Sequence, residues 1–197
     1  GKPLLANDPH LGLSAPAIWY FARLKVPAAA GGQPLDAIGA TLPGLPGVVI
    51  GRNERIAWGV TNVGADVEDL YLLEEVEGRG YRYKGRVVPY GVREEVIRVK
   101  GGREEVLKVR ETVYGPVITD ALEDPPKTPM ALRWVSLDEE DHILMAFLGV
   151  NRAGNWEEFK KALLPYSAPS QNFVYADVEG NIGYIATEDA YKVGGYQ

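Results

Sequence analysis

The chain has 197 residues, with 21 basic and 27 acidic side chains and no cysteine. The net charge of −6 disfavours a surface that binds phosphate groups, so we expect no nucleic-acid partner. The lack of cysteine excludes disulfides, thiol nucleophiles and cysteine-based zinc sites. Gly, Pro or charged residues interrupt the apolar runs well before the roughly 20 residues that a membrane-spanning helix needs, so we expect no membrane partner.

Alternating apolar and polar residues, the pattern typical of strands, predominate in the first part of the chain. Sequences rich in Gly, Pro and Asn, at 43–47 and 51–54, predict tight turns between the apolar segments. Short strands are therefore expected at 18–26, 37–41, 48–50, 56–60 and 70–73.

Residues 81–119 predict a meander of antiparallel strands. Apolar stretches at 92–99 and 106–109 flank a Lys-Gly-Gly-Arg sequence at 100–103, which is a good hairpin signal. Their outward positions carry Arg, Glu and Lys, a composition that suits strands with one solvent-exposed face and discourages the pairing of edges. We interpret this region as an exposed β excursion.

Two helices are expected late in the chain. The first is predicted over 138–150, with the acids Glu139, Glu140 and Asp141 at the end where the helix dipole favours them. The second begins after Asn155, a plausible N-cap with Glu158 three residues on, and Pro165 ends it. Strands at 173–176 and 182–186 then flank a turn, so the predicted fold class is α+β.

The chain has only two histidines, His10 and His142. His142 lies in a helical pattern and is interpreted as structural or as a surface residue. His10 follows an apolar segment in a polar turn, a place where functional groups are often presented. Together with Asp8 and Ser14 it suggests a triad, but three such residues within seven positions are more often turn chemistry.

Two other polar groups are candidates for a site. Asp66, Glu68 and Asp69 offer hard oxygen ligands suited to Ca²⁺, but the residues alone favour a solvated acidic loop, because calcium needs six to eight oxygens that such a loop cannot supply unaided. Gln171 and Asn172 precede an apolar strand and could place amide donors at its end. Asn is also common at the start of strands, so this second signal is weak alone.

Seven segments occur in an order typical of one known family. They are GKPLLANDPHL at 1–11, LPGLPG at 42–47, GRNERIAWG at 51–59, DVEDLY at 66–71, RETVYGP at 110–116, NWEEF at 155–159 and NFVYADVEGNIGY at 172–184. With these segments the chain resembles the β-chain of the penicillin acylase family of N-terminal-nucleophile (Ntn) hydrolases. The resemblance implies a strand-rich segment of the αββα Ntn fold, carrying an antiparallel β excursion and two helices.

The resemblance also implies how the chain is organised. Core strands and a calcium loop are expected in residues 1–80, the β excursion in 81–130, and helices with returning core strands in 131–197. These parts form one incomplete domain. The partners implied are the α-chain and the remainder of the β-chain of the same precursor, and the family usually works in the periplasm or outside the cell.

The chemistry that the resemblance implies is amide hydrolysis through a serine at the start of the β-chain. The serine hydroxyl attacks the amide, and its own α-amino group, with an ordinary pKa near 8, serves as the base. In this family backbone and side-chain amides stabilise the oxyanion of the acyl-enzyme pathway. The substrate class is an acyl amide, either a β-lactam side chain or an N-acyl-homoserine lactone.

The resemblance assigns roles to particular positions of this sequence. His10 matches the residue near the nucleophile, and Asn62 matches the position whose backbone N–H points into the oxyanion hole. The positions that match the lining of the acyl pocket are Leu11, Ile50, Phe147 and Gln171. Asp66, Glu68 (through its carbonyl) and Asp69 match the calcium loop. Leu11, and a histidine at position 10 in place of Gln, favour an aliphatic over an aryl-acetyl group.

Two groups of the family pattern are expected outside this sequence. The nucleophilic serine would precede Gly1, and the second oxyanion donor, an asparagine, would follow Gln197. We therefore expect this chain alone to be inactive. The alternative hypothesis is a non-catalytic, secreted β-rich binding module that docks through residues 81–119. A serine encoded shortly before Gly1, preceded by a cleavable propeptide, would decide for the enzyme.

Overall fold

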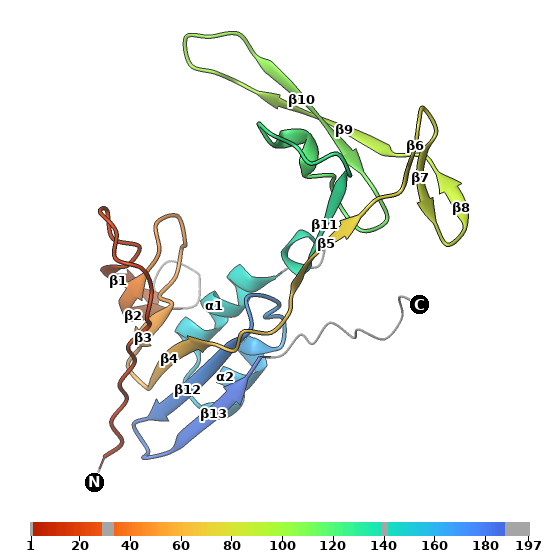
Figure 1. Ribbon diagram of the computed structural model, residues 1–197. Coiled ribbons are helices and arrows are strands. Elements are labelled where there is room, and N and C mark those ends of the chain that lie inside the picture. The colour runs from red at the N-terminus through yellow and green to blue at the C-terminus, as the bar shows by residue number, and fades with distance from the viewer. Residues whose placement is uncertain (1, 29–33, 139–141, 188–197) are drawn as a thin grey trace. The chain divides into compact units, whose positions relative to one another are not determined.

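The computed structural model describes residues 2–28, 34–138 and 142–187 (Figure 1). The chain divides into two compact units. The first comprises Gly1–Val67 and Glu139–Gln197, and the second comprises Glu68–Asp138. Residues 81–130, which the sequence assigns to the β excursion, lie within the second unit.

The first unit is built on a six-stranded antiparallel sheet with the order β1-β2-β3-β4-β12-β13. Strands far apart in the sequence meet at its centre, because β12 pairs directly with β4. The strands are β1 (Tyr20–Val26), β2 (Leu35–Thr41), β3 (Ile50–Arg52), β4 (Ile56–Asn62), β12 (Gln171–Asp177) and β13 (Ile182–Ala186).

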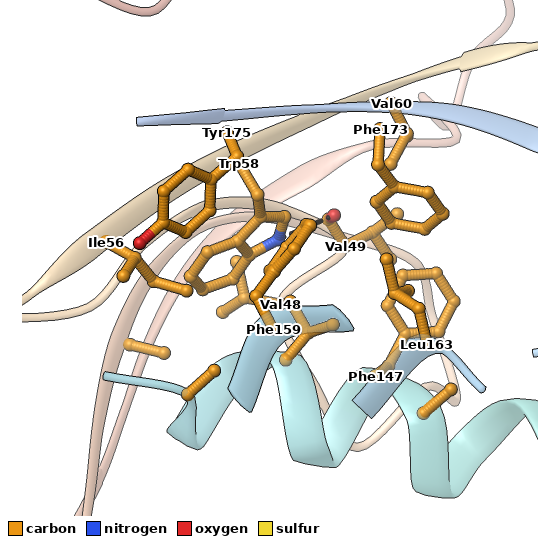
Figure 2. Packing of buried hydrophobic residues seen from close by; sticks show 14 of the residues in the cluster. Val48, Val49, Ile56, Trp58, Val60, Phe147, Phe159, Leu163, Phe173 and Tyr175 are labelled. Carbon is orange, nitrogen blue, oxygen red and sulfur yellow. Dashed lines mark hydrogen bonds between the residues drawn. The ribbon is translucent and has the colours of Figure 1, made fainter. Parts of the chain in front are cut away.

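Two helices, α1 (Ile143–Arg152) and α2 (Trp156–Leu163), cover one face of this sheet, and the main core lies between them and the strands (Figure 2). Trp58, Phe159 and Phe173 are fully buried there. The indole Nε1 of Trp58 donates to the carbonyl of Val49 at 2.9 Å, so the one polar atom of this side chain is satisfied (Figure 2).

The predicted N-cap of the second helix is confirmed. Asn155 Oδ1 accepts the backbone N–H of Glu158 at 3.0 Å. The Glu158 carboxylate in turn accepts from the Asn155 side-chain amide at 3.0 Å and from the Gly154 N–H at 2.8 Å. These reciprocal bonds satisfy donors that a helix start would otherwise leave exposed.

The predicted start of the first helix is wrong. A helix was expected from Asp138, but α1 begins at Ile143. Asp138 has an extended backbone at the end of a 3₁₀ turn (Val135–Leu137), and its carboxylate accepts from the guanidinium of Arg133. The acids Glu139, Glu140 and Asp141 lie outside the described residues.

The third predicted strand is displaced. It was expected at 48–50 with a turn at 51–54, but β3 spans Ile50–Arg52. Val48 cannot join a strand ladder because its N–H donates to Asn151 Oδ1 (2.7 Å) and its carbonyl accepts from Asn151 Nδ2 (2.8 Å). The side chain of Asn151, on α1, therefore replaces a strand partner at this point.

Asp177 organises the tight turn between β12 and β13. Its Oδ1 accepts the backbone N–H groups of Glu179 (3.0 Å) and Asn181 (2.9 Å). Its Oδ2 accepts from the Asn181 side-chain amide and the Tyr175 hydroxyl, both at 2.9 Å. Burial acts to raise the pKa of Asp177, but these hydrogen bonds, led by those from Asn181, lower that pKa to about 2.

The second unit consists of short antiparallel pairings around a small core of Leu73, Tyr81, Val117 and Ala131. The predicted hairpin is confirmed, since β9 pairs with β10. The other pairings are β5 with β11 and the three-stranded β6-β7-β8. The strands are β5 (Glu68–Leu72), β6 (Glu75–Val76), β7 (Gly80–Tyr83), β8 (Arg86–Val88), β9 (Gly91–Ile97), β10 (Glu105–Glu111) and β11 (Met130–Trp134), and a 3₁₀ turn spans Thr119–Ala121.

Within the described ranges, the structure contains no helix that is both long enough and apolar enough to cross a membrane.

Candidate functional site

A cavity of about 700 Å³ opens in the first unit, where the end of β4 and the start of β12 meet α1 and the N-terminal segment. Most of its walls are apolar, with polar groups gathered at the strand ends. The lining residues are Asp8, Pro9, His10, Leu11, Ile18, Trp19, Leu42, Leu45, Val49, Val60, Thr61, Asn62, Ile143, Phe147, Tyr166, Pro169 and Gln171. A cavity of this size and composition suits a mainly apolar small molecule with one polar end.

The apolar wall is fixed by core packing. Phe147 lies on the face of α1 that contacts the sheet, and its ring packs edge-to-face with that of Tyr166 at 5.7 Å between centroids. The Tyr166 hydroxyl donates to the carbonyl of Pro169 at 2.8 Å. This side of the cavity is therefore formed by side chains that the core already holds in place.

The polar end of the cavity is a pair of amides on neighbouring strands. Gln171 lies directly opposite Asn62 in the β12–β4 register, and Gln171 Nε2 donates to Asn62 Oδ1 at 2.5 Å. The side-chain amide of Asn172 donates to the Asn62 carbonyl at 3.3 Å. The backbone N–H of Gln171 donates to Thr187 Oγ1 at 3.0 Å. The amide side chains are thus ordered by the sheet.

On the other side of β4, the side chain of Asn7 binds the strand backbone. Val60 N donates to Asn7 Oδ1 at 2.9 Å, and Asn7 Nδ2 donates to the Val60 carbonyl at 3.0 Å. No role was predicted for Asn7 from the sequence. Gly59, inside an otherwise apolar strand, was the available signal, because such a glycine often marks a close approach of another chain segment.

The residues suggested as a triad are not arranged as one. His10 Nε2 lies 3.3 Å from Asp8 Oδ2, and both side chains are largely exposed. The Ser14 hydroxyl donates to the carbonyl of Pro16 at 3.0 Å, a local contact typical of a turn. His10 nevertheless lines the cavity.

The structure brings most of the residues of the predicted site to one place. His10, Asn62, Leu11, Phe147 and Gln171 all line the cavity. Ile50, the remaining pocket residue suggested by the resemblance, belongs to β3 and is not among the lining residues.

The acidic residues suggested as calcium ligands do not form a donor set by themselves. Asp66, Glu68 and Asp69 are exposed. Glu68 and Asp69 are adjacent in β5, so their side chains project from opposite faces of the strand. Within residues 2–28, 34–138 and 142–187, no three His, Cys, Asp or Glu residues are grouped to hold a metal ion. Calcium binding stays a prediction.

Comparison with known proteins identifies the family. The family model described as penicillin amidase matches residues 1–196. Acyl-homoserine lactone acylase QuiP of Pseudomonas aeruginosa is 35% identical over 200 residues, which cover 95% of this chain and 23% of that protein. Penicillin G acylase of Escherichia coli is 34% identical over 188 residues, covering 94% of this chain and 21% of that protein.

A solved structure extends the agreement to the fold. The thermostable penicillin G acylase from Alcaligenes faecalis superposes with a TM-score of 0.71 and 31% identity, over 90% of this chain and 31% of that one. The α+β assignment and the Ntn-hydrolase fold are confirmed by this likeness. The chain spans less than a quarter of the length of the curated relatives named above. It belongs to the penicillin amidase family.

Proposed function

We propose that the parent protein hydrolyses acyl amides and that this chain supplies the pocket for the acyl group. The observation that carries the proposal is the cavity of about 700 Å³, apolar along Leu11 and Phe147 and ending in the amides of Asn62 and Gln171. An acyl chain needs an apolar wall, and its carbonyl needs nearby donors at one end. Family membership supports the same reaction class.

The proposed reaction uses a serine at the start of the β-chain, before Gly1. Its hydroxyl oxygen attacks the amide carbon, its α-amino group takes the hydroxyl proton, and that proton passes to the departing amine. Water then attacks the acyl-enzyme ester, which releases the carboxylic acid and restores the serine. The backbone N–H of Asn62 is proposed as one donor to the oxyanion formed in both steps.

The proposed substrates are amides of aliphatic acyl groups, including N-acyl-homoserine lactones. The cavity walls are formed largely by aliphatic and aromatic side chains, which match a hydrocarbon chain. Two relatives are named for different substrates, one an acyl-homoserine lactone acylase and the other a penicillin G acylase. A periplasmic or extracellular location and the α-chain as a partner belong to the same proposal.

The test is hydrolysis of chromogenic acyl-anilides by the parent protein and by the 197-residue chain. We expect turnover by the parent that is lost when its N-terminal serine is replaced by alanine. We expect the 197-residue chain to release no more chromophore than that serine variant. Turnover by the isolated chain would contradict the assignment of the nucleophile, and an inactive parent would favour the binding-module alternative.

A further inference from the structure

The edge of β4 beside the cavity is left open by its neighbour. β3 begins only at Ile50 and pairs with β4 only opposite Ala57 and Trp58, so it does not reach Val60. In the antiparallel register Val60 lies opposite Phe173 of β12. The two backbone bonds of Val60 run instead to Asn7, so they lie on the side that β3 has vacated.

The Asn7 amide fills this gap as a strand residue would. Its oxygen accepts from the Val60 N–H at 2.9 Å and its nitrogen donates to the Val60 carbonyl at 3.0 Å. A side-chain amide has the same donor and acceptor pair as a peptide group, so both backbone groups of Val60 are satisfied by one residue. The bond joins positions 53 residues apart in the sequence.

The fit depends on the absence of a side chain at Gly59. A Cβ built there would lie 2.8 Å from Asn7 Cβ and 2.9 Å from Asn7 Cγ, closer than real contacts allow. Gly59 is buried in the middle of β4, and its φ is not in the left-handed region that requires glycine. The close approach of Asn7 is therefore the reason that the structure offers for a glycine at this position.

Asn7 has no regular secondary structure on either side of it. Residues 2–19 form no strand or helix, so the backbone ladder that orders other segments is missing there. Asp8, Pro9, His10 and Leu11 follow Asn7 directly and line the cavity. Fixing Asn7 to Val60 fixes the start of this wall.

We infer that Asn7 is a positioning residue for the cavity: by binding the open edge of β4 at Val60, it holds His10 and Leu11 where they line the site. The role of the cavity as an acyl pocket rests on the proposed function. The clamp, by which we mean the two hydrogen bonds between Asn7 and Val60, does not. Loss of the Asn7 side chain would leave the core intact but would let residues 8–11, which line the cavity, move. The affinity for long apolar ligands would then fall most.

The clamp is tested by amide hydrogen exchange on the parent protein. Asn7→Ala is expected to increase exchange of the Val60 amide at least about tenfold, because its acceptor is lost. Asn7→Asp keeps the acceptor and loses the donor, so an intermediate effect is expected. Gly59→Ala should reproduce Asn7→Ala with the asparagine intact. Asn181→Ala, the same truncation at the β12–β13 turn, should leave Val60 unchanged.

The positioning role is tested by titrating decanoate and butyrate into the same variants by calorimetry. We expect Asn7→Ala to weaken decanoate binding about fivefold and butyrate binding much less. A merely structural role would lower the amount of binding-competent protein and leave both dissociation constants unchanged.

Each outcome decides a separate point. Val60 exchange that is the same in wild type and Asn7→Ala overturns the clamp. Faster exchange with unchanged decanoate and butyrate affinities overturns the positioning role. If the wild-type parent binds decanoate but cleaves no acyl-anilide, the proposed function is rejected and the clamp is not affected. A wild-type parent that does not bind decanoate overturns the positioning role.

Discussion

Two asparagines each bind the backbone N–H and carbonyl of one valine with the same pair of hydrogen bonds, one in the core and one beside the cavity. Asn151 binds Val48 at 2.7 and 2.8 Å and is only 1% exposed. Asn7 binds Val60 at 2.9 and 3.0 Å and is half-buried. The bonds are alike, but water can replace only the second pair. We therefore assign Asn151 to the stability of the whole unit and Asn7 to the local order of the site.

The largest effect is expected from Asn151→Ala. It leaves the N–H and carbonyl of Val48 without partners in the core, and we expect the free energy of unfolding to fall by about 3 kcal/mol. Urea-induced unfolding followed by tryptophan fluorescence measures this change. A loss below about 1 kcal/mol would show that the burial of Asn151 does not make its contribution to stability larger than that of Asn7.

The next largest effect is expected at Asp177, where a carboxylate binds backbone groups. Because its pKa of about 2 is below the ordinary value, it stabilises the fold above about pH 4, and this contribution disappears as the pH falls towards 2. Asp177→Asn should cost about 1–2 kcal/mol at pH 7. The difference in free energy of unfolding between this variant and wild type, measured by thermal or urea unfolding, should shrink below pH 4. A difference that stays constant down to pH 2.5 would contradict a stabilising role for the ionised carboxylate.

A smaller effect is expected from Asn155→Ala, which removes the cap of α2 at an exposed position. The loss of its bond to the Glu158 N–H should lower the free energy of unfolding by about 1 kcal/mol. This variant is the solvent-exposed counterpart of Asn151→Ala in the same unfolding experiment. If Asn155→Ala lowers the free energy of unfolding as much as Asn151→Ala does, solvent exposure does not determine the size of the loss.

The smallest global effect is expected from Asn7→Ala, at less than about 1 kcal/mol, since water reaches the Val60 groups once the amide is gone. Its consequences should be local, in the exchange of the Val60 amide and in binding at the cavity. Global destabilisation equal to that of Asn151→Ala would remove the distinction between the two clamps.

The sequence could predict features that depend on neighbouring residues. The Asn155 cap is one, because its partner Glu158 is three residues away, and the β9–β10 hairpin is another. The start of α1 and the place of β3 were missed. In the second case the decisive partner of Val48 is Asn151, 103 residues away, which no local pattern reveals.

The candidate site divides in the same way. From the residues alone, His10 and Gln171 were only weak signals, and it was the resemblance that placed Leu11, Phe147 and Asn62 with them. The cavity brings these five together. Asn7 was missed because its function depends on an edge that exists only once β3 stops short of Val60.

We expect the cavity of the first unit to bind the acyl chain of the substrate. The most direct measurement is kcat/KM of the parent protein for a series of acyl-anilides of increasing chain length, with Leu11→Trp compared with wild type. Leu4→Trp is the matched control, because Leu4 is 97% exposed and does not line the cavity. We predict that Leu11→Trp shifts the preferred acyl chain to a shorter length, while Leu4→Trp leaves the profile unchanged. An unaltered profile for Leu11→Trp would contradict this prediction.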